Sequence, residues 1–585
     1  MRRQKSALAR GACPTVCYAQ EVNRFAWALA AAALLAGCHR NQRGRETLPH
    51  ARAADAVTTY QYNNARTGSD SAETTLTPRD VNRRRFGLLA RLRVDGPIYA
   101  QPLYMPGVRI PGQGVHNVVF VATENDSVYA FDAAGHPAAP LWRRRLAYPA
   151  FGIRPVPAAA LDCAQILPAV GITATPVLDP RTRTIYVLAR TLEHGKFVQR
   201  LHALSWATGQ DLRPPAVIAA TALGRGEGAR AISGKSDSVV RFDPRRNNAR
   251  AGLVLTHGII YMAWASSCDV RPYHGWIMAY RAANLRQVGA WCATPDGDAG
   301  GIWQSGNGLA ADRRGHVYFA TGNGTFDANR GGRDYGDSVV ELALTPRGLR
   351  VRDYFTPFDQ AELARQDKDV GSAGVVLLPA QPGPAPPLLL AEGKRRDIYL
   401  LNRRHLGGFH PGGDTQIVQS LRMVNGSAFS LPAYFHRRLY SATVNQLIQV
   451  YTLQHGRLLA PPAQGTVRFP WPGATPVVSS NHGRHAIVWL LRTNGWKPGS
   501  EAVLYALRAA NIRQVLYASN AAGERDAAGV GVKFAVPLVA HGRVYVGTQD
   551  ALDIYGVRPG PQRPRRSRRG PAANIRGSKH PARRG

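Results

Sequence analysis

A short stretch of the sequence, residues 300–337, holds side chains that could bind a flat ligand and a cation. Its segment HVYFATG, at 316–322, runs through aromatic and β-branched residues and predicts a strand covered on both faces. Trp303 precedes this strand, Asn323 follows it, and an aspartate lies in a nearby loop. Aromatic rings pack on flat ligands, while amide and carboxylate oxygens bind hard cations. Because loops at strand ends commonly carry function, we expect a site here.

The elements that must position this stretch form a repeat between about Thr58 and Gly556. A strand, a tight turn and a second strand recur about every 50 to 65 residues. Eight copies are centred on residues 117–135, 183–209, 258–280, 315–344, 387–403, 437–453, 485–509 and 542–557. One small twisted sheet cannot cover both of its faces, whereas a ring of sheets can. The repeat therefore predicts an all-β fold, an eight-bladed β-propeller over residues 58–556.

Composition favours one large β domain over several smaller domains. The 585 residues include 59 glycines and 41 prolines, spread throughout, and apolar runs are short and bounded by turn signals. We expect residues 58–100, including 86–93, to supply an outer strand to the last blade. This strand would join the two ends of the repeat region.

The turns of the repeat resemble those of quinoprotein propellers. The turns FDAAG and SWATG, with Trp142 after the first, are similar to the repeat of the pyrroloquinoline quinone (PQQ)-dependent alcohol and sugar dehydrogenases. The family carries a Trp-Gly motif, a strand and then Thr-Gly-Asn. Here Gly300-Gly301-Ile302-Trp303 is followed by Thr321-Gly322-Asn323. The resemblance implies a dehydrogenase fold with PQQ and calcium as cofactors.

The resemblance also implies roles for five residues. Trp303 would be the floor under the quinone ring, and Asn323 would bind calcium. Asp269 lies where the family places a glutamate ligand of calcium, and Asp369 where it places the catalytic aspartate. Lys394 matches the cationic partner of the quinone. The alternative for Trp303 and Asn323 is structural, with the ring packed between blades and the amide in a left-handed turn.

Three departures from the family pattern affect these roles. Asp269 is shorter than glutamate, and Lys368 stands where the family has a tryptophan before the catalytic aspartate. The adjacent cysteine pair that covers the quinone in alcohol-oxidising members is missing, as it is in sugar-oxidising relatives. No motif for a c-type haem is present in the sequence.

The N-terminus predicts export and lipid anchoring. A basic lead-in precedes the apolar segment FAWALAAAALLAG, which is too short for a stable transmembrane helix. The segment ends in Leu35-Ala36-Gly37-Cys38, which resembles the bacterial lipobox. We expect a lipoprotein signal peptide over residues 1–37, lipidation of Cys38, and a flexible linker over residues 38–57. The alternative is an ordinary cleaved signal.

Cysteine use agrees with an oxidising compartment. Cys163, Cys268 and Cys292 remain after the signal and Cys38 are set aside. We expect at most one disulfide among them and favour Cys268 with Cys292, which lie within one repeat.

The formal net charge of +36 is concentrated in part at the C-terminus. Residues 557–585 hold many arginines and no acidic residue, which predicts a disordered basic tail. The tail would adhere to anionic lipid, and nucleic acid is a disfavoured partner for an exported protein. Codon bias toward arginine is an equal explanation of the charge.

Two functions of different classes follow. The first is a lipid-anchored quinoprotein of the cell envelope, periplasmic or outer-membrane facing, that oxidises a small alcohol or sugar hydroxyl. The second is a non-catalytic propeller scaffold that binds an envelope protein, similar to the lipoprotein of outer-membrane β-barrel assembly.

Overall fold

The computed structural model describes residues 55–395, 397–422, 426–494, 499–559 and 585. The predicted signal peptide, Cys38, most of the predicted linker and most of the basic tail lie outside these residues. The described part is almost entirely strand and loop, with one α-helix, α1 (Gln360–Arg365). No helix in it combines the length and apolar character needed to span a membrane.

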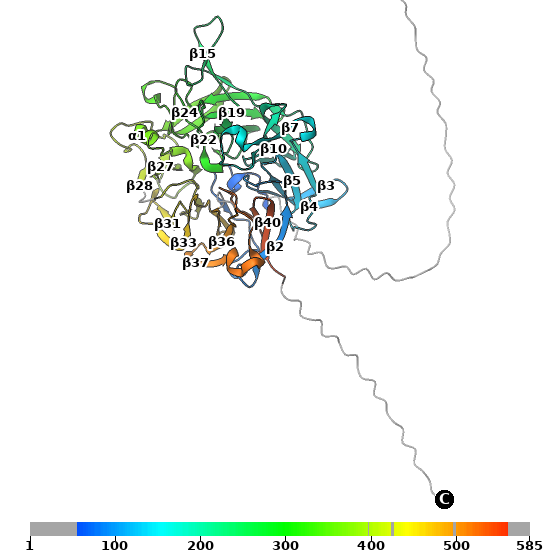
Figure 1. Ribbon diagram of the computed structural model, residues 1–585. Coiled ribbons are helices and arrows are strands. Elements are labelled where there is room, and N and C mark those ends of the chain that lie inside the picture. The colour runs from blue at the N-terminus through cyan, green and yellow to red at the C-terminus, as the bar shows by residue number, and fades with distance from the viewer. Residues whose placement is uncertain (1–54, 396, 423–425, 495–498, 560–584) are drawn as a thin grey trace, which may run out of the picture. The chain divides into compact units, whose positions relative to one another are not determined.

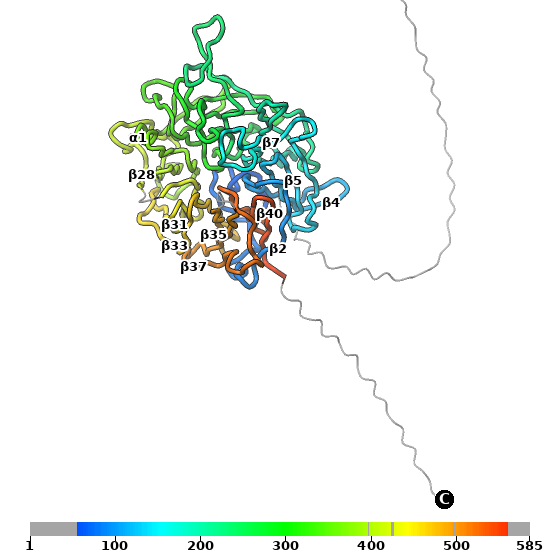
Figure 2. The backbone as a smooth tube through the Cα atoms, in the orientation of Figure 1, coloured from blue at the N-terminus to red at the C-terminus, as the bar shows by residue number. Residues whose placement is uncertain are grey.

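Eight of the nine sheets in the described part share one pattern, in which four antiparallel strands pair with their neighbours. The first four contain β3–β6 (Leu103–Ile110, Gly114–Ala122, Ser127–Asp132, Trp142–Arg145), β9–β12 (Val177–Asp179, Thr184–Glu193, Lys196–Ser205, Ala216–Val217), β17–β20 (Val254–Thr256, Ile259–Ser266, Trp276–Arg281, Gln287–Cys292) and β21–β24 (Ala310–Ala311, Val317–Ala320, Val339–Thr345, Gly348–Phe355). The tube in Figure 2 passes through these sheets in chain order.

The other four sheets complete the order. They contain β25–β28 (Gly374–Leu377, Leu388–Glu392, Asp397–Asn402, Gln419–Arg422), β29–β31 with β33 (Ala433–Phe435, Arg438–Ser441, Gln446–Gln454, Ala463–Phe469), β34–β37 (Val477–Asn481, Arg484–Arg492, Val503–Arg508, Asn511–Ala518) and β38–β40 with β2 (Leu538–Ala540, Arg543–Gly547, Ala551–Val557, Phe86–Arg93). The β-propeller fold is thereby confirmed.

The two ends of the repeat region meet in the last of these sheets. β2 pairs antiparallel with β40, from Phe86 opposite Val557 to Arg93 opposite Ala551, and the two strands lie side by side in Figure 1. The expectation that residues 86–93 supply the outer strand is confirmed. Strand pairing thus closes the ring without a covalent link.

Shorter elements extend this framework. β7 (Ile153–Pro157) and β8 (Ala169–Val170) extend the second sheet, β16 (Asn247–Asn248) the third, β32 (Arg457–Leu458) the sixth, and β1 (Ser69–Asp70) the seventh. The ninth sheet contains β13 (Thr221–Leu223), β14 (Arg230–Ala231) and β15 (Ser238–Arg241). Figure 1 shows β15 in a projection from the ring.

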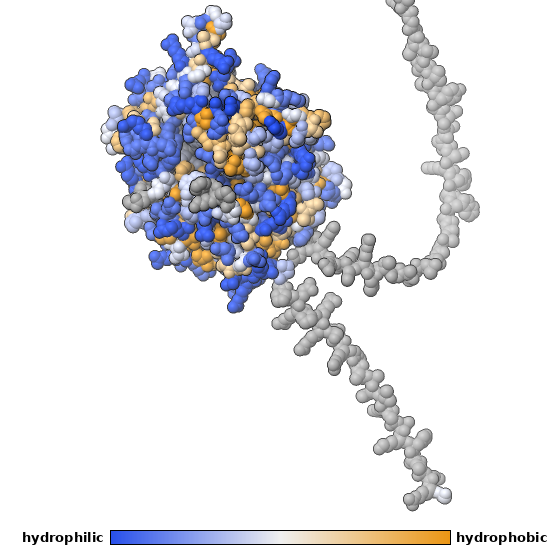
Figure 3. All heavy atoms as spheres, viewed as in Figure 1, coloured by the Kyte–Doolittle hydropathy of each residue, from blue (hydrophilic) through white to orange (hydrophobic). Residues whose placement is uncertain are grey.

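The hydrophobic core lies between neighbouring sheets. Leu188 of the second sheet packs in one buried cluster with Met262 and Trp276 of the third. Phe319 of the fourth sheet is in another cluster with Ile277 of the third. Apolar strand faces are therefore covered by the next sheet, as the repeat predicts. Outside the core, hydrophilic and hydrophobic residues are interspersed on the face seen in Figure 3.

The segment 57–68 ties the eight sheets together, which the sequence did not predict. It hydrogen-bonds the first strand of every sheet, through Tyr104, Leu178, Leu255, Ala311, Leu377, Tyr434, Val478 and Val539. Its Arg66 is fully buried and donates to the carbonyl oxygens of Leu309 and Leu253. Since first strands line the axis of a propeller, the segment crosses that axis.

Candidate functional site

A cavity of about 1000 Å³ is lined by loops from several sheets. Four of the five predicted site residues line it: Asp269, Trp303, Asp369 and Lys394. Asn323 is not among the lining residues, but its side chain and backbone contact two residues that are. The structure therefore brings together side chains that are well separated in the sequence.

Asp369 and Lys394 form an ion pair at this cavity. The Lys394 Nζ atom is 2.9 Å from Asp369 Oδ2, and the Lys394 backbone N–H donates to the Asp369 carbonyl at 2.8 Å. Asp369 lies between α1 and β25 and is 7% exposed, and Lys394 follows β26. Burial lowers the pKa of Lys394, but the charges of Asp369 and Asp367 outweigh burial and raise it. Lys394 is therefore a permanent cation beside a carboxylate.

Asn323 follows β22 and supports the same carboxylate. Its backbone N–H donates to Asp369 Oδ1 at 3.0 Å, and its Nδ2 donates to Asp367 Oδ1 at 3.0 Å. The Asn323 Oδ1 atom is buried and has no hydrogen-bond partner among the described residues. A buried acceptor without a donor indicates a missing partner, such as a cation.

Tyr273 connects Trp303 with Asp269, another of the predicted site residues. The Trp303 and Tyr273 rings meet edge to face, with centroids 6.3 Å apart, and the Tyr273 hydroxyl donates to Asp269 Oδ1 at 2.7 Å. Burial raises the pKa of Asp269; Tyr273 opposes this rise, and the charges of Asp369 and Asp367 add to it. Trp303 is partly buried and lines the cavity, so it does not lie wholly within the core between sheets.

Gly322 allows Trp303 and Asp369 to approach each other. A Cβ atom at position 322 would lie 2.3 Å from Asp369 Oδ1 and 2.8 Å from the Trp303 ring. Real Cβ atoms do not approach so closely, so only glycine fits this arrangement. The Thr-Gly-Asn motif thus has a steric reason for its central residue.

Two residues of the site, Asp367 and Tyr273, were not predicted from the sequence. Asp367 accepts from Lys394 at 2.6 Å, and its side chain is 74% exposed. Tyr273 connects Trp303 with Asp269, as described above. Both lie close in sequence to a predicted site residue: Asp367 is two residues before Asp369, and Tyr273 is four residues after Asp269. This closeness is the feature of the sequence that indicates them.

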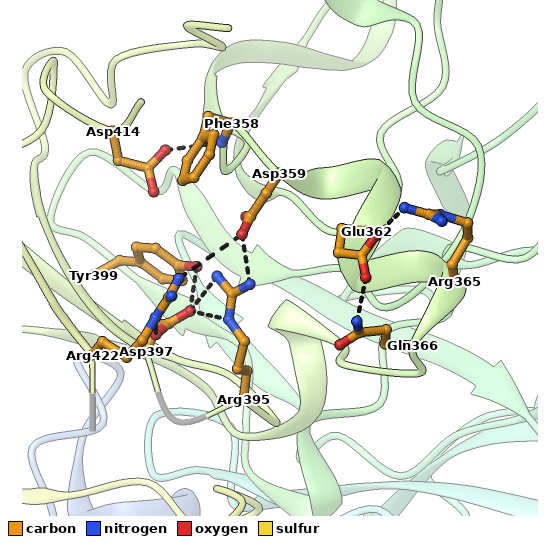
Figure 4. Close-up of polar contacts among 10 residues, drawn as sticks. All are labelled: Phe358, Asp359, Glu362, Arg365, Gln366, Arg395, Asp397, Tyr399, Asp414 and Arg422. Carbon is orange, nitrogen blue, oxygen red and sulfur yellow. Dashed lines mark hydrogen bonds and ion pairs between the residues drawn. The ribbon is translucent and has the colours of Figure 1, made fainter. Parts of the chain in front are cut away.

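A second ion-pair network holds the loop that carries Asp369. Arg395, next to Lys394, bridges Asp359 before α1 and Asp397 at the start of β27, each at 2.5 Å. Figure 4 shows Arg395 between these carboxylates, with Arg422 on the far side of Asp397. Asp397 is 3% exposed. The network connects the residue before α1 with the start of β27, close in sequence to Asp369 and Lys394.

The cysteine prediction is wrong in its pairing. Cys163 forms a disulfide with Cys268, with α-carbons 5.5 Å apart, and Cys292 is a free, buried thiol. Trp276 of β19 lies between Trp264 of β18 and Cys292 of β20. Cys292 is therefore about two strand spacings, roughly 10 Å, from the strand that leads to Cys268. The expectation of at most one disulfide among the three is confirmed.

The disulfide lies at the cavity. Cys268 lines it beside Asp269, and Cys163 lies between β7 and β8, just before the lining residues Ala164 and Gln165. The bond thus connects a loop of the second sheet with a loop of the third. The sequence showed that an adjacent cysteine pair was missing, but it did not indicate this longer-range one.

Among the described residues, no group of three His, Cys, Asp or Glu side chains is placed to hold a metal ion. The oxygen set at the cavity combines Asp269, Asp367 and Asp369 with the amide of Asn323, and Lys394 already neutralises part of it. The predicted metal and catalytic roles of these residues stay predictions.

Comparison with known proteins gives structural matches only. No protein-family model matches the sequence, and no curated protein matches it. The fold is similar to the quinohemoprotein alcohol dehydrogenase from Comamonas testosteroni, with a TM-score of 0.57, 14% identity, and coverage of 88% of this chain and 83% of that chain. It is also similar to a europium-containing methanol dehydrogenase, with a TM-score of 0.54, 13% identity, and coverage of 86% and 98%. Similarity at this identity shows the fold alone.

Proposed function

We propose that this protein is an exported quinoprotein that binds PQQ and calcium and oxidises a hydroxyl group of an alcohol or sugar. One observation carries the proposal: the Asp369–Lys394 ion pair lies in the same cavity as Trp303 and Asp269. A carboxylate held by a cation beside an aromatic wall suits the removal of a proton from a bound alcohol. The fold similarity to quinoprotein dehydrogenases supports the same function.

The cavity offers donor types that such cofactors need, although the described residues contain no group of three His, Cys, Asp or Glu placed around one metal position. Asn323 Oδ1 is a buried acceptor with no donor among the described residues, in a residue that contacts the lining residues Asp367 and Asp369, and Asp269 supplies carboxylate oxygens at the cavity. These two would hold the calcium, which prefers oxygen ligands. Trp303 would pack on the flat ring, and Lys394 would face a quinone oxygen. Gly322 leaves room because it has no side chain.

The chain's own residues then perform the proton chemistry. A bound quinone would supply the acceptor for the hydride of the alcohol carbon. Asp369 takes the hydroxyl proton, since each of its oxygens has one hydrogen-bond donor and retains a lone pair. Lys394 and the Asn323 N–H fix the orientation of this carboxylate. The low exposure of Asp369 keeps bulk water away from the reacting proton.

Reconstitution tests the proposal. The purified mature protein would be mixed with PQQ and calcium, and we expect a change in PQQ absorbance, a higher melting temperature and dye-linked oxidation of an alcohol or sugar. Asp369→Asn should keep PQQ binding and lose oxidation, whereas Asp237→Asn, at an exposed position between β14 and β15, should change neither. Absence of PQQ binding to the folded protein would refute the cofactor and favour the scaffold function.

The lipid anchor belongs to the same proposal. Cys38 would carry the lipid and place the protein in the cell envelope, with the basic tail as a second contact with anionic lipid. Cys38→Ala should move the protein from the membrane fraction to the soluble fraction. Membrane retention after this change would assign the attachment to the tail or to another contact.

A further inference from the structure

The same cavity holds two buried cations that the proposed chemistry does not use. Arg250 and Lys533 both line it and are 6% and 5% exposed. Arg250 lies between β16 and β17, and Lys533 lies before β38, so they come from the third and eighth sheets. Neither forms an ion pair or a hydrogen bond with a described residue, and the Arg250 Nη2 atom is buried without a partner.

The sequence offers no acidic partner for them in the internal gaps of the described chain. Residues 396, 423–425 and 495–498 contain no Asp or Glu. Burial lowers the pKa of Arg250, and Tyr99, Glu124 and Asp269 oppose this only through space. Burial, and then the positive charge of Arg250, lower the pKa of Lys533. Burying two neighbouring cations with no carboxylate in direct contact among the described residues is unfavourable, which favours binding of an anion in the cavity.

Aromatic rings surround the two cations. The Lys533 ammonium is 5.4 Å from the Trp471 ring centroid and 5.5 Å from that of Phe534, and the Arg250 guanidinium is 5.3 Å from Phe534. Trp471 and Phe534 are 6.1 Å apart and form a group with Phe429, which also lines the cavity. Ring faces attract the cations, yet they supply no hydrogen-bond acceptor that replaces water. The chemistry of this wall suits a planar ring that carries carboxylates.

We propose that Arg250 and Lys533 form an anion subsite that binds the carboxylate groups of a ligand in this cavity. The proposal rests on the proposed function and deepens it, because PQQ is a planar ring with three carboxylates. The same subsite chemistry would also accept the carboxylate of a hydroxy-acid substrate. The two sources are separated by the probes below.

The test measures binding rather than turnover. The mature protein would be titrated with PQQ, with pyridine-2,4,6-tricarboxylate, with gluconate and with glucose, and quenching of tryptophan fluorescence would be followed. Arg250→Gln and Lys533→Met should each weaken binding of the carboxylated ring compounds at least about tenfold. Arg241→Gln and Lys196→Met, which remove exposed cations outside the cavity, should leave binding unchanged.

A second readout separates binding from folding. Without ligand, Lys533→Met should raise the melting temperature, since it removes a buried charge that lacks an ion pair. The further rise in melting temperature on adding ligand should be smaller in this variant than in the natural protein. Lys533→Arg and Arg250→Lys keep the charge and should retain most of the affinity. If the charge-removing variants instead unfold and the charge-keeping variants fold but bind no ligand, the subsite is refuted.

The outcomes distinguish this subsite from the proposed function. Binding of PQQ and the tricarboxylate that depends on both cations supports the subsite and assigns it to the cofactor. If the tricarboxylate binds in a way that depends on Arg250 and Lys533 but PQQ does not bind, the subsite is supported and the cofactor is overturned. If only gluconate binds in this way, the subsite is assigned to a substrate. Normal PQQ binding by both charge-removing variants overturns the subsite and leaves the proposed function intact. If no probe binds, the subsite is overturned.

Discussion

Two sets of charges line the same cavity, and they differ in how they are neutralised. Lys394 is paired with Asp367 and Asp369, so its charge is balanced within the protein. Arg250 and Lys533 are buried beside aromatic rings and have no ion pair with the described residues. The paired carboxylate is held in a fixed orientation, whereas buried cations with no ion pair would gain from binding an anion. Under the two proposals, the Asp369–Lys394 pair is the reacting part of the cavity, and Arg250 with Lys533 is the part that anchors a ligand.

Removing the charge of the reacting carboxylate should give the largest effect. We expect Asp369→Asn to lower the rate of hydroxyl oxidation about 10² to 10⁴-fold, because general-base catalysis contributes on that order. Steady-state rates of the reconstituted protein measure this loss. Affinity for the anionic probes should be retained, because that affinity depends on Arg250 and Lys533. An equal loss of affinity would show that the two sets of charges act as one.

Breaking the disulfide should be the next largest effect. The bond between Cys163 and Cys268 closes a sequence separation of 105 residues, and loss of such a bond typically lowers the free energy of unfolding by about 2–5 kcal/mol. Denaturant unfolding of the Cys163→Ser, Cys268→Ser double variant measures it. Cys292→Ala, which removes a buried free thiol, is the control and should have a smaller effect. A reducing agent should destabilise the natural protein but not the double variant.

Adding one methyl group should disturb the reacting part without changing its charge. Gly322→Ala places a Cβ against both Trp303 and Asp369, so we expect about a tenfold loss of oxidation or more with a modest fall in stability. Gly412→Ala is a suitable control, because the nearest atom to its added Cβ is 3.4 Å away. Unchanged kinetics of Gly322→Ala would show that the contact between Trp303 and Asp369 is unimportant.

The smallest effect should come from pH, and it should change the affinity of Arg250 and Lys533 for an anionic ligand. Burial, with Arg250 adding to it, lowers the pKa of Lys533 to about 7, and burial raises the pKa of Glu124 near Arg250 to about 7. As pH rises through 7, Lys533 loses its positive charge and Glu124 gains a negative charge. Both changes oppose anion binding, so we expect affinity for the tricarboxylate to be about tenfold weaker at pH 9 than at pH 6.

The titration of Lys533 also predicts how the free energy of unfolding of the ligand-free protein varies with pH. Between pH 7 and about 10, Lys533 is protonated in the unfolded chain but not in the folded protein. The contribution of Lys533 to the free energy of unfolding therefore increases with pH. The stability difference between the natural protein and Lys533→Met should shrink across this range. A difference that does not vary with pH would mean that Lys533 stays charged in the folded protein.

Much of the architecture could be predicted from the sequence, because each repeat carries its own hydrophobic pattern and turns. The segment HVYFATG indicated a covered strand, and β22 is buried throughout. The closing strand at residues 86–93 was predictable because a ring of repeats needs a partner at its open edge. The segment 57–68 was not, since its role depends on hydrogen bonds to eight separate strands rather than on any local pattern.

The sequence by itself determined the repeat, and with it the loops on which Asp269, Trp303, Asn323, Asp369 and Lys394 lie. Only the tertiary structure decided which of these side chains meet, because residues far apart in the chain become neighbours through ring closure. It also decided that Cys268 pairs with Cys163 rather than with Cys292, since Cys292 lies about two strand spacings, roughly 10 Å, from the strand that leads to Cys268. Arg250 and Lys533 carried no signal in the sequence, where two more cations in a basic chain are unremarkable. Their burial with no ion pair to a described residue is a property of the folded cavity alone.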